Sequence, residues 1–134
     1  MNKTYDEILI GDKYFFSKTI ESCDVYSFAG ITGDFNPAHL NEEFARNTMF
    51  KHRVAHGMLG VGLISGAIVQ KVSSDTCTIV RQNVSFKKPV YFGDTITVNL
   101  EVITVENGTC TLKTNCINQY GNIVIEGFVT IAKF

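Results

Sequence analysis

The sequence predicts an α+β fold in which a long antiparallel sheet curls around one apolar helix. Two stretches of the chain carry this prediction. Residues 54–70 contain no Asp, Glu, Lys or Arg, which is typical of a helix that is apolar on nearly all sides and buried in a core. From about Thr76 onward, apolar and polar residues alternate, which indicates half-buried strands. Such strands would supply the surface that wraps the helix.

The length and composition favour one compact domain over residues 1–134. A domain usually holds about 100–200 residues, and 45% of this chain is hydrophobic, which is the composition of a globular protein. The 12 Lys and Arg residues against 13 Asp and Glu residues give a net charge of -1. This balance predicts neither nucleic acid nor an anionic membrane as the main partner.

The first half of the chain predicts one strand and two short helices before the apolar helix. The strand would span Lys13 to Ile20. Ser22 is a candidate cap for a helix over roughly Asp24 to Ile31, where apolar residues have helical spacing. A second short helix would span Glu42 to Asn47.

The second half predicts the remaining strands of a sheet with about five. Thr76 to Phe86 is one strand, stopped before Pro89. The others lie within residues 94–102, 109–117 and 123–134, and turn signals such as Glu106-Asn107-Gly108 separate them. Within residues 94–102, one face of the strand is apolar and is expected to be buried; this face consists of Ile96, Val98, Leu100 and Val102.

The chain is expected to act in the cytoplasm. Its first residues, MNKTYDEILIGDKYFF, mix charged with apolar side chains and lack the continuous apolar run of a secretory signal. No membrane span is expected, because the stretch of residues 54–70 is shorter than about 18 residues and contains four glycines. The cysteines form no C-x-x-C pair and are expected to be free, buried thiols; they are Cys23, Cys77, Cys110 and Cys116.

The segment from Ala29 to Leu40 is the strongest candidate for chemistry. Asp34 and His39 lie on either side of Pro37, which stiffens the turn between them. A carboxylate and a neutral imidazole held in this way can share a water molecule, which the carboxylate orients and the imidazole deprotonates. The same residues also fit a plain turn, in which Asp34 and Asn36 bond their own backbone.

A second candidate site is the start of the apolar helix, where His56 precedes Gly57. Unpaired backbone amides and the positive end of the helix dipole favour developing negative charge there, and glycine lets a ligand approach the backbone. Alternatively, the two residues only begin and pack the helix. The hydroxyl of Ser65, farther along, is expected to bond a carbonyl one turn back rather than to act as a nucleophile.

Other kinds of site are not indicated. His52 and His56 lack the glutamate between them that a zinc protease requires, and no cysteine lies nearby, so no metal is expected. The serine hydrolase, phosphate-loop and dinucleotide motifs are absent. Basic residues within 46–53 and at 87–88 fit solvated surface, or contacts with the phosphates of a nucleotide-tailed substrate.

Three motifs combine along this chain. They are Gly33-Asp34-Phe35-Asn36-Pro37-Ala38-His39, then His56-Gly57-Met58, and later Ser85-Phe86-Lys87-Lys88-Pro89-Val90 with Gly93-Asp94. Together they resemble the MaoC-like (R)-specific enoyl-CoA hydratases, over a region from about Lys13 to the C-terminus. The resemblance implies a hot-dog fold, in which an antiparallel sheet wraps a long helix. It also implies reversible addition of water to a trans-2-enoyl-CoA, which gives the (R)-3-hydroxyacyl-CoA.

The same resemblance implies roles for single residues. Asp34 and His39 would be the catalytic pair, and the backbone N–H of Gly57 would bind the oxyanion. The further oxyanion-binding or substrate-binding candidates are Ser65, Asn36 and His56. The resemblance implies no metal or redox cofactor and a homodimer. Three alternatives stay open: a (3R)-hydroxyacyl-carrier-protein dehydratase, a hot-dog acyl-CoA thioesterase, and a non-catalytic acyl-CoA-binding module.

Overall fold

Five antiparallel strands form one sheet, in the order β1-β3-β4-β5-β2, in this computed structural model. The structure describes residues 4–73 and 77–134. The strands are β1 Lys13–Thr19, β2 Cys77–Phe86, β3 Thr95–Val105, β4 Thr109–Ile117 and β5 Ile123–Lys133. The predicted number of strands is confirmed, and the predicted ranges agree closely with the observed ones. Thr76, the predicted start of β2, lies outside the described residues.

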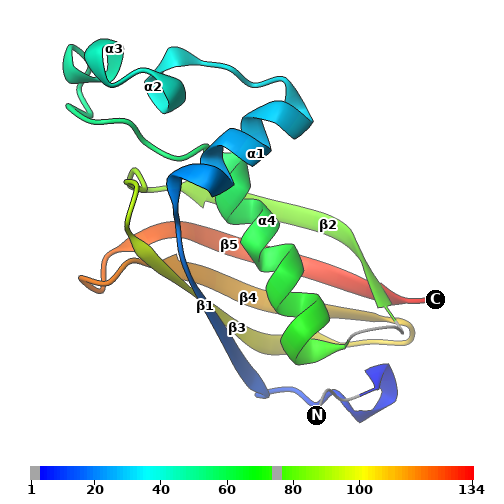
Figure 1. The fold of residues 1–134 in the computed structure, drawn as a ribbon. Helices are drawn as coiled ribbons and strands as arrows, with labels where there is room; N and C mark the ends of the chain where they lie inside the picture. Colours follow the sequence, from blue (N-terminus) through cyan, green and yellow to red (C-terminus); the bar gives the residue numbers. More distant parts are fainter. Residues whose placement is uncertain (1–3, 74–76) are drawn as a thin grey trace.

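One α-helix lies across a face of this sheet, and the other α-helices gather beyond one end of it (Figure 1). Helix α4 (Gly57–Ala67) runs over the sheet and continues into a π-helical turn, η2 (Ile68–Val72). The helices near the N-terminal end of α4 are α1 (Ser22–Thr32), α2 (Pro37–Leu40) and α3 (Glu42–Arg46), and a short 3-10 helix, η1 (Tyr5–Glu7), precedes β1. The expected hot-dog arrangement of helix and sheet is confirmed.

The core forms between α4 and the alternating inner side chains of the sheet. The predicted inner face of β3 is confirmed, because Ile96, Val98, Leu100 and Val102 are each at most 2% exposed. They share one hydrophobic cluster with Ile64 and Ala67 of α4, with Ile68 of η2, and with inner residues of β4 and β5. Burial of this apolar surface is the main source of stability for such a fold.

Helix α4 is buried on one side only. Ile64 and Ala67 are fully buried, whereas Met58 is 57% exposed and Gly62 and Ser65 are also exposed. The expectation of burial on nearly all sides is therefore wrong for the single chain. The reason is geometric, since one five-stranded sheet covers only the helix face turned toward it.

The helix ends differ slightly from the predicted ones. Helix α1 begins at Ser22, and its N-cap is Glu21 rather than Ser22. The carboxylate of Asp24, at the third helical position, accepts a hydrogen bond from the N–H of Glu21 at 2.8 Å, which is the contact that an acidic residue makes in a capping box. Helix α3 ends one residue before the predicted Asn47. Helix α2 was not predicted, because its four residues are too few to show helical periodicity.

The cysteines are free, as predicted, and three of them are buried: Cys77, Cys110 and Cys116. The prediction of burial is wrong for Cys23, which is exposed. Helix α1 turns Val25 and Ala29 toward the core, and Cys23, two residues before Val25, falls on the opposite side of the helix. Among the described helices, none has the length and apolar character needed to cross a membrane.

Candidate active site

The loop after α1 holds its own shape through short side-chain hydrogen bonds. Gly33 ends the helix with φ 78°, a conformation that glycine adopts without strain. The Asp34 Oδ1 atom accepts from the Asn36 N–H at 3.2 Å, and the Asn36 Oδ1 atom accepts from the Ala38 N–H at 3.0 Å. Asn36 thereby caps α2. The predicted turn is present, and it sets the position of Asp34 relative to α2.

Helix α2 presents His39 in one defined orientation. The His39 Nδ1 atom lies 2.6 Å from the carbonyl oxygen of Val54. Since a carbonyl only accepts hydrogen bonds, Nδ1 carries the proton and Nε2 carries the lone pair in the neutral ring. This is the tautomer that a general base needs when it acts through Nε2.

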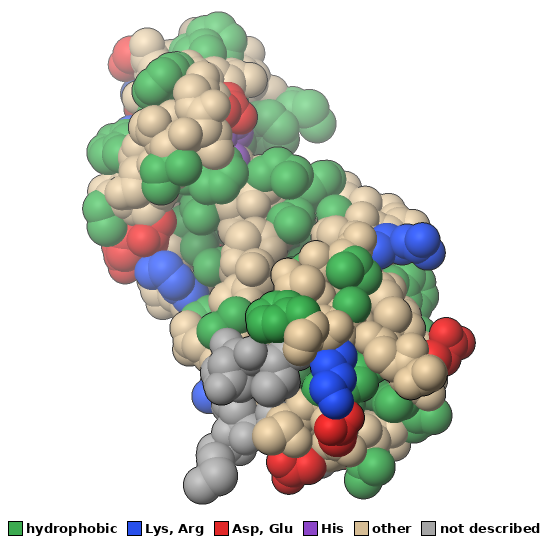
Figure 2. All heavy atoms as spheres, turned by 90° about the vertical axis from the view of Figure 1, so that its right-hand side faces the viewer, with side chains coloured by type: hydrophobic (Ala, Val, Ile, Leu, Met, Phe, Trp, Pro, Cys, Tyr) green, Lys and Arg blue, Asp and Glu red, His purple; other side chains and the backbone are tan. Residues whose placement is uncertain are grey.

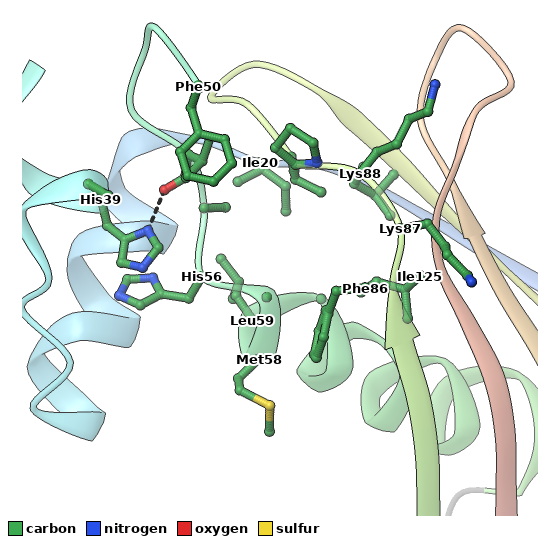
Figure 3. Close-up of a pocket in the computed structure, with 18 of the residues that line it drawn as sticks. Ile20, His39, Phe50, His56, Met58, Leu59, Phe86, Lys87, Lys88 and Ile125 are labelled. Carbon is green, nitrogen blue, oxygen red and sulfur yellow. Dashed lines mark hydrogen bonds between the residues drawn. The ribbon is translucent and has the colours of Figure 1, made fainter. Parts of the chain in front are cut away.

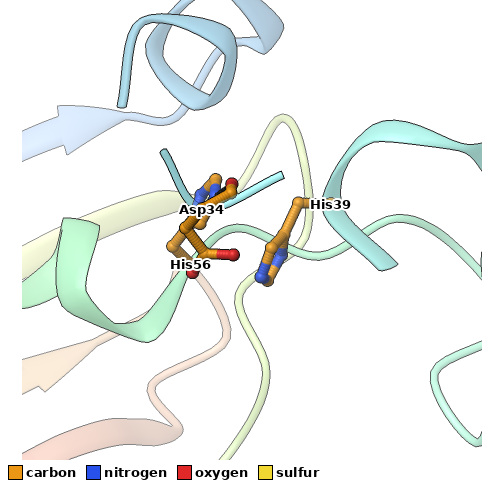
Figure 4. Close-up of side chains that lie close together, drawn as sticks. All are labelled: Asp34, His39 and His56. Atoms are coloured by element: carbon orange, nitrogen blue, oxygen red, sulfur yellow. Dashed lines mark hydrogen bonds between the residues drawn. The ribbon is translucent and has the colours of Figure 1, made fainter. Parts of the chain in front are cut away.

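His56 contacts both candidate catalytic residues, Asp34 and His39. It is 3% exposed, and its Nε2–H donates to the backbone carbonyl of Asp34 at 2.9 Å. Its ring stacks on that of His39, with 3.9 Å between the centroids, and it also contacts Phe28. One polar atom from each of Asp34, His39 and His56 lies within 4.8 Å of the other two (Figure 4). The structure therefore joins two candidate sites that are separate in the sequence.

A pocket of about 580 Å³ opens beside this cluster. The polar groups at one side of the pocket are His39, His56 and Asn36, beside the start of α4 (Figure 3). Most of the remaining lining is apolar and comes from the sheet and from the segments next to it. Three of these apolar residues are nearly fully buried: Ile20, Ile96 and Ile125. The pocket therefore combines an apolar interior with a few polar groups at one side, which is typical of small-molecule sites.

Gly57 lines the pocket as the first residue of α4. Its N–H has no carbonyl one turn back to bond, because the helix only begins there. A Cβ atom at this position would lie 2.8 Å from the ring of Phe86. A larger residue here would therefore displace the ring of Phe86, which is 53% exposed, whereas glycine leaves that ring packed against the start of α4.

Of the other residues proposed from the sequence, some line the pocket and others lie on the surface away from it. Ser65 is exposed on α4 and does not line the pocket. Lys87 and Lys88 line it on the side opposite the histidines (Figure 3). Arg53 packs over Phe92 instead, at 4.6 Å from the ring centroid. Of the basic residues expected near a substrate phosphate, the two lysines are the ones that reach the pocket.

The segment that carries Val54 is held by Glu42 of α3. The Glu42 carboxylate accepts from the Arg53 N–H at 2.9 Å and pairs with the His52 ring at 3.0 Å. The hydrogen bond with His52, followed by that from Arg53, lowers the pKa of Glu42 below its usual value. His52 is therefore a surface partner of Glu42, and it does not lie in the cluster with His56.

Val54 is the residue of the candidate site that the sequence did not indicate. It contacts His39 through its backbone carbonyl, so its side-chain type carries no signal. Its N–H donates to the Ala38 carbonyl at 3.2 Å, and this bond and the one from His39 tie α2 to the segment before α4.

Comparison with known proteins supports a relationship over most of the chain. The family model for the MaoC like domain matches residues 7–131. The chain belongs to the MaoC-like family. It is 40% identical over 129 residues to the (R)-specific enoyl-CoA hydratase of Rhodospirillum rubrum, with 95% of this chain and 89% of that protein covered.

Further relatives include a solved hydratase structure and an enzyme named as a dehydratase. The unliganded R-hydratase PhaJ1 from Pseudomonas aeruginosa superposes with a TM-score of 0.92 at 35% identity, covering 98% of this chain and 86% of that one. A mitochondrial 3-hydroxyacyl-[acyl-carrier-protein] dehydratase from Solanum lycopersicum is 30% identical, over 85% of this chain and 70% of that protein. The hot-dog fold expected from the motifs is thus that of a solved hydratase.

Proposed function

We propose that the protein is an (R)-specific enoyl-CoA hydratase, a hydro-lyase that adds water reversibly to a trans-2-enoyl-CoA. The observation that carries the proposal is the bond between the His39 Nδ1 atom and the Val54 carbonyl. It leaves the lone pair on Nε2, in a cluster with Asp34, beside an apolar pocket. The hydratase relative from Rhodospirillum rubrum supports the same reaction.

In the proposed reaction, His39 acts first as a base and then as an acid. Asp34 orients a water molecule, and the Nε2 atom of His39 takes one of its protons while the water oxygen attacks C3 of the enoyl thioester. The electron pair of the double bond moves toward the thioester carbonyl, which becomes an enolate. His39 then returns the proton to C2. Because water and proton come from the same residues, both add to one face of the double bond.

The start of α4 would stabilise the enolate. The negative charge develops on the thioester oxygen, and the free N–H of Gly57 at the positive end of the helix dipole suits it. Asn36 would brace the loop through its cap on α2. His56 would position Asp34 and His39 rather than bind substrate, because its N–H is already bonded to the Asp34 carbonyl. The mechanism needs no cofactor beyond the thioester of the substrate.

The pocket suggests how the substrate would lie. The acyl chain would enter the apolar part near Ile20, Ile96 and Ile125. The CoA phosphates would lie near Lys87 and Lys88, since lysine binds phosphate as a point charge. Lys87 pairs with Glu126 at 3.3 Å, which leaves Lys88 as the stronger candidate.

We also propose that the chain forms a homodimer in the cytoplasm. Strand β2 pairs only with β5 among the described residues, so its other edge is open. Apolar side chains of β2 and η2 are exposed, including Val80 at 57% and Val69 at 48%. Figure 2 shows hydrophobic side chains spread over this side of the molecule, and a hollow between the helical part and the sheet. A second copy would cover both the open edge and the bare side of α4.

Hydration of crotonyl-CoA tests the proposal. The ultraviolet absorbance of the enoyl thioester should fall on adding the protein, and chiral analysis should identify the (R)-3-hydroxy product. Release of free thiol with the double bond intact would indicate a thioesterase instead. Binding of the thioester without any turnover would indicate a non-catalytic module.

A second candidate function is dehydration of a (3R)-hydroxyacyl group on a carrier protein. The relative from Solanum lycopersicum favours it, and so do the two lysines at the pocket. The test compares crotonyl-CoA with the same acyl group on a carrier protein. A much higher kcat/KM on the carrier protein would select this alternative.

A further inference from the structure

The contact between His39 and Val54 imposes a tautomer that a free histidine side chain adopts less often. A neutral histidine in water carries its ring proton mainly on Nε2. Here the Val54 carbonyl oxygen lies 2.6 Å from the His39 Nδ1 atom, so the proton is on Nδ1 and the lone pair is on Nε2. Whatever holds the Val54 peptide group against α2 therefore also controls the tautomer of the proposed base.

Three consecutive hydrogen bonds join the segment before α4 to the helices α2 and α3. The Arg53 N–H donates to the Glu42 Oε1 atom at 2.9 Å. The Val54 N–H donates to the Ala38 carbonyl at 3.2 Å, and the Val54 carbonyl accepts from His39. Of the two side chains in this series, one belongs to the proposed base itself, and the other is that of Glu42.

Glu42 and His39 belong to one rigid corner of the chain. Asn41 ends α2 and also caps α3, since its N–H donates to the Pro37 carbonyl and its side-chain oxygen accepts from the Phe44 N–H. Glu42 is the first residue after this cap. Its carboxylate and the His39 ring thus contact neighbouring residues of the opposite segment from two fixed points of the same corner.

The opposite segment is anchored to the rest of the fold. The Arg53 guanidinium donates to the Tyr26 hydroxyl of α1 at 2.6 Å and packs over Phe92, 4.6 Å from the ring centroid. The Ala55 N–H donates to the Val90 carbonyl at 2.8 Å. The segment is therefore a fixed frame, and the Glu42 carboxylate holds the corner of α2 and α3 against it.

We propose that Glu42 is a positioning residue for His39. By accepting the Arg53 N–H, it keeps the Val54 carbonyl within reach of the His39 Nδ1–H and so keeps the lone pair on Nε2. Glu42 does not line the pocket beside His39, so it acts through that residue and not on the substrate. The effect on catalysis rests on the proposed hydratase function, whereas the effect on the tautomer does not.

The tautomer is tested first, without any substrate, by nitrogen NMR on protein with labelled histidines. The chemical shift of a ring nitrogen shows whether it carries a proton. At a pH where the ring is neutral, the parent should have the His39 proton on Nδ1, and Glu42→Ala should move part of it to Nε2. Glu42→Gln should keep the parent pattern, because its amide oxygen can accept the same N–H. An unchanged tautomer in folded Glu42→Ala, or failure of Glu42→Gln to preserve it, would overturn the proposal.

Glu43→Ala is the matched control. Glu43 lies beside Glu42 in the first turn of α3, so both carboxylates interact with the same helix dipole. The Glu43 carboxylate pairs with Arg46 at the surface instead of with the segment before α4. Its removal should leave the His39 tautomer and the hydration rate unchanged. Equal changes in the two alanine variants would assign the effect to the stability of α3 and contradict the role of the bond to Arg53.

The catalytic effect is tested separately on crotonyl-CoA. Glu42→Ala should lower kcat about tenfold and leave KM within about twofold of the parent value, and Glu42→Gln should restore kcat. In a His39→Gln background, Glu42→Ala should cause no further loss, because both substitutions remove the same function. A further loss there would contradict an action through His39. A tautomer shift in Glu42→Ala, with no hydration by the parent, would sink the proposed function and leave the positioning role standing.

Discussion

The carbonyl oxygen of Val54 accepts a hydrogen bond of 2.6 Å from the Nδ1 atom of His39. Val54 lies in the segment just before α4, whereas His39 lies in α2, so the bond connects the two parts of the site. It sets the tautomer of His39, whose ring lies in one cluster with Asp34 and His56. The chemistry proposed for the protein depends on this one contact between a side chain and the backbone.

The Gly57→Ala substitution should reduce both stability and hydration. The added Cβ atom would lie 2.8 Å from the Phe86 ring, and overpacking of this kind costs about 1–3 kcal/mol. Thermal unfolding and the crotonyl-CoA assay measure the two effects. Gly30→Ala, at an exposed position of helix α1, is the control, because nothing lies within 4 Å of its Cβ position. That substitution should be neutral or stabilise the helix by about 1 kcal/mol. Equal effects of the two substitutions would contradict the packing argument.

The Lys88→Gln substitution should raise KM for a CoA thioester more than it lowers kcat. Lys88 lines the pocket on the side away from the histidines, where it would meet a phosphate rather than the reacting atoms. Loss of one exposed phosphate contact should raise KM several-fold, and added salt should diminish the difference. Lys113→Gln, on the sheet surface away from this pocket, should leave KM unchanged. A drop in kcat alone would argue against a phosphate contact.

Only Cys23 should react rapidly with a thiol reagent in the folded protein. Burial raises the pKa of Cys116 to about 12 and that of Cys110 to about 11, and it also raises the pKa of Cys77. Since the thiolate is the reactive form, these three thiols are protected both by access and by protonation. Ellman's reagent should modify one thiol quickly per folded chain and all four after denaturation. Fast labelling of a folded Cys23→Ser variant would show that the buried thiols are accessible.

Asp24 should stabilise α1 at neutral pH and lose this effect in acid. The hydrogen bond from the Glu21 N–H is the main cause that lowers the pKa of Asp24 below 3.8, and Lys18 adds to it. A carboxyl whose pKa is lowered by folding stabilises the protein above its unfolded pKa, and the gain is lost as the pH falls through the folded pKa.

Urea unfolding of Asp24→Asn measures that contribution. The substitution keeps a hydrogen-bond acceptor and removes the charge, so it should cost roughly 0.5 kcal/mol near neutral pH and progressively less as the pH falls below about 4. Glu43→Gln is the control, because Glu43 forms an exposed pair with Arg46 and should cost less than about 0.5 kcal/mol. A cost for Asp24→Asn that stays constant in acid would rule out the charge as its source.

Periodicity predicted the central strands of the sheet well because β3 and β4 bury alternate residues against a single core. The buried faces of β3 and β4 are the ones that the alternation of apolar and polar residues predicts, and the buried face of β4 includes Cys110 and Cys116. The local spacing of apolar residues did not predict burial correctly where the burial of a helix depends on the elements packed against it. Helix α4 is uniformly apolar, yet only one face meets the sheet, and Cys23 lies on the outer side of α1.

The sequence indicated the side chains of the candidate site, but it did not indicate the contacts between them. Asp34 and His39 stand close together in the sequence beside a proline, which indicates a shared turn. The stacking of His56 on His39 joins residues 17 positions apart, and no local pattern reports such a contact. No argument from side-chain type can identify the Val54 carbonyl, since every residue carries a backbone carbonyl.

Hydration of crotonyl-CoA by Asp34→Asn and His39→Gln tests the central claim most directly. Each variant should keep the fold, as judged by circular dichroism and thermal unfolding, and should lose about 10²- to 10⁴-fold in kcat. His52→Gln, which alters a histidine outside the cluster, should retain the parent rate. Wild-type rates in both Asp34→Asn and His39→Gln would contradict the account.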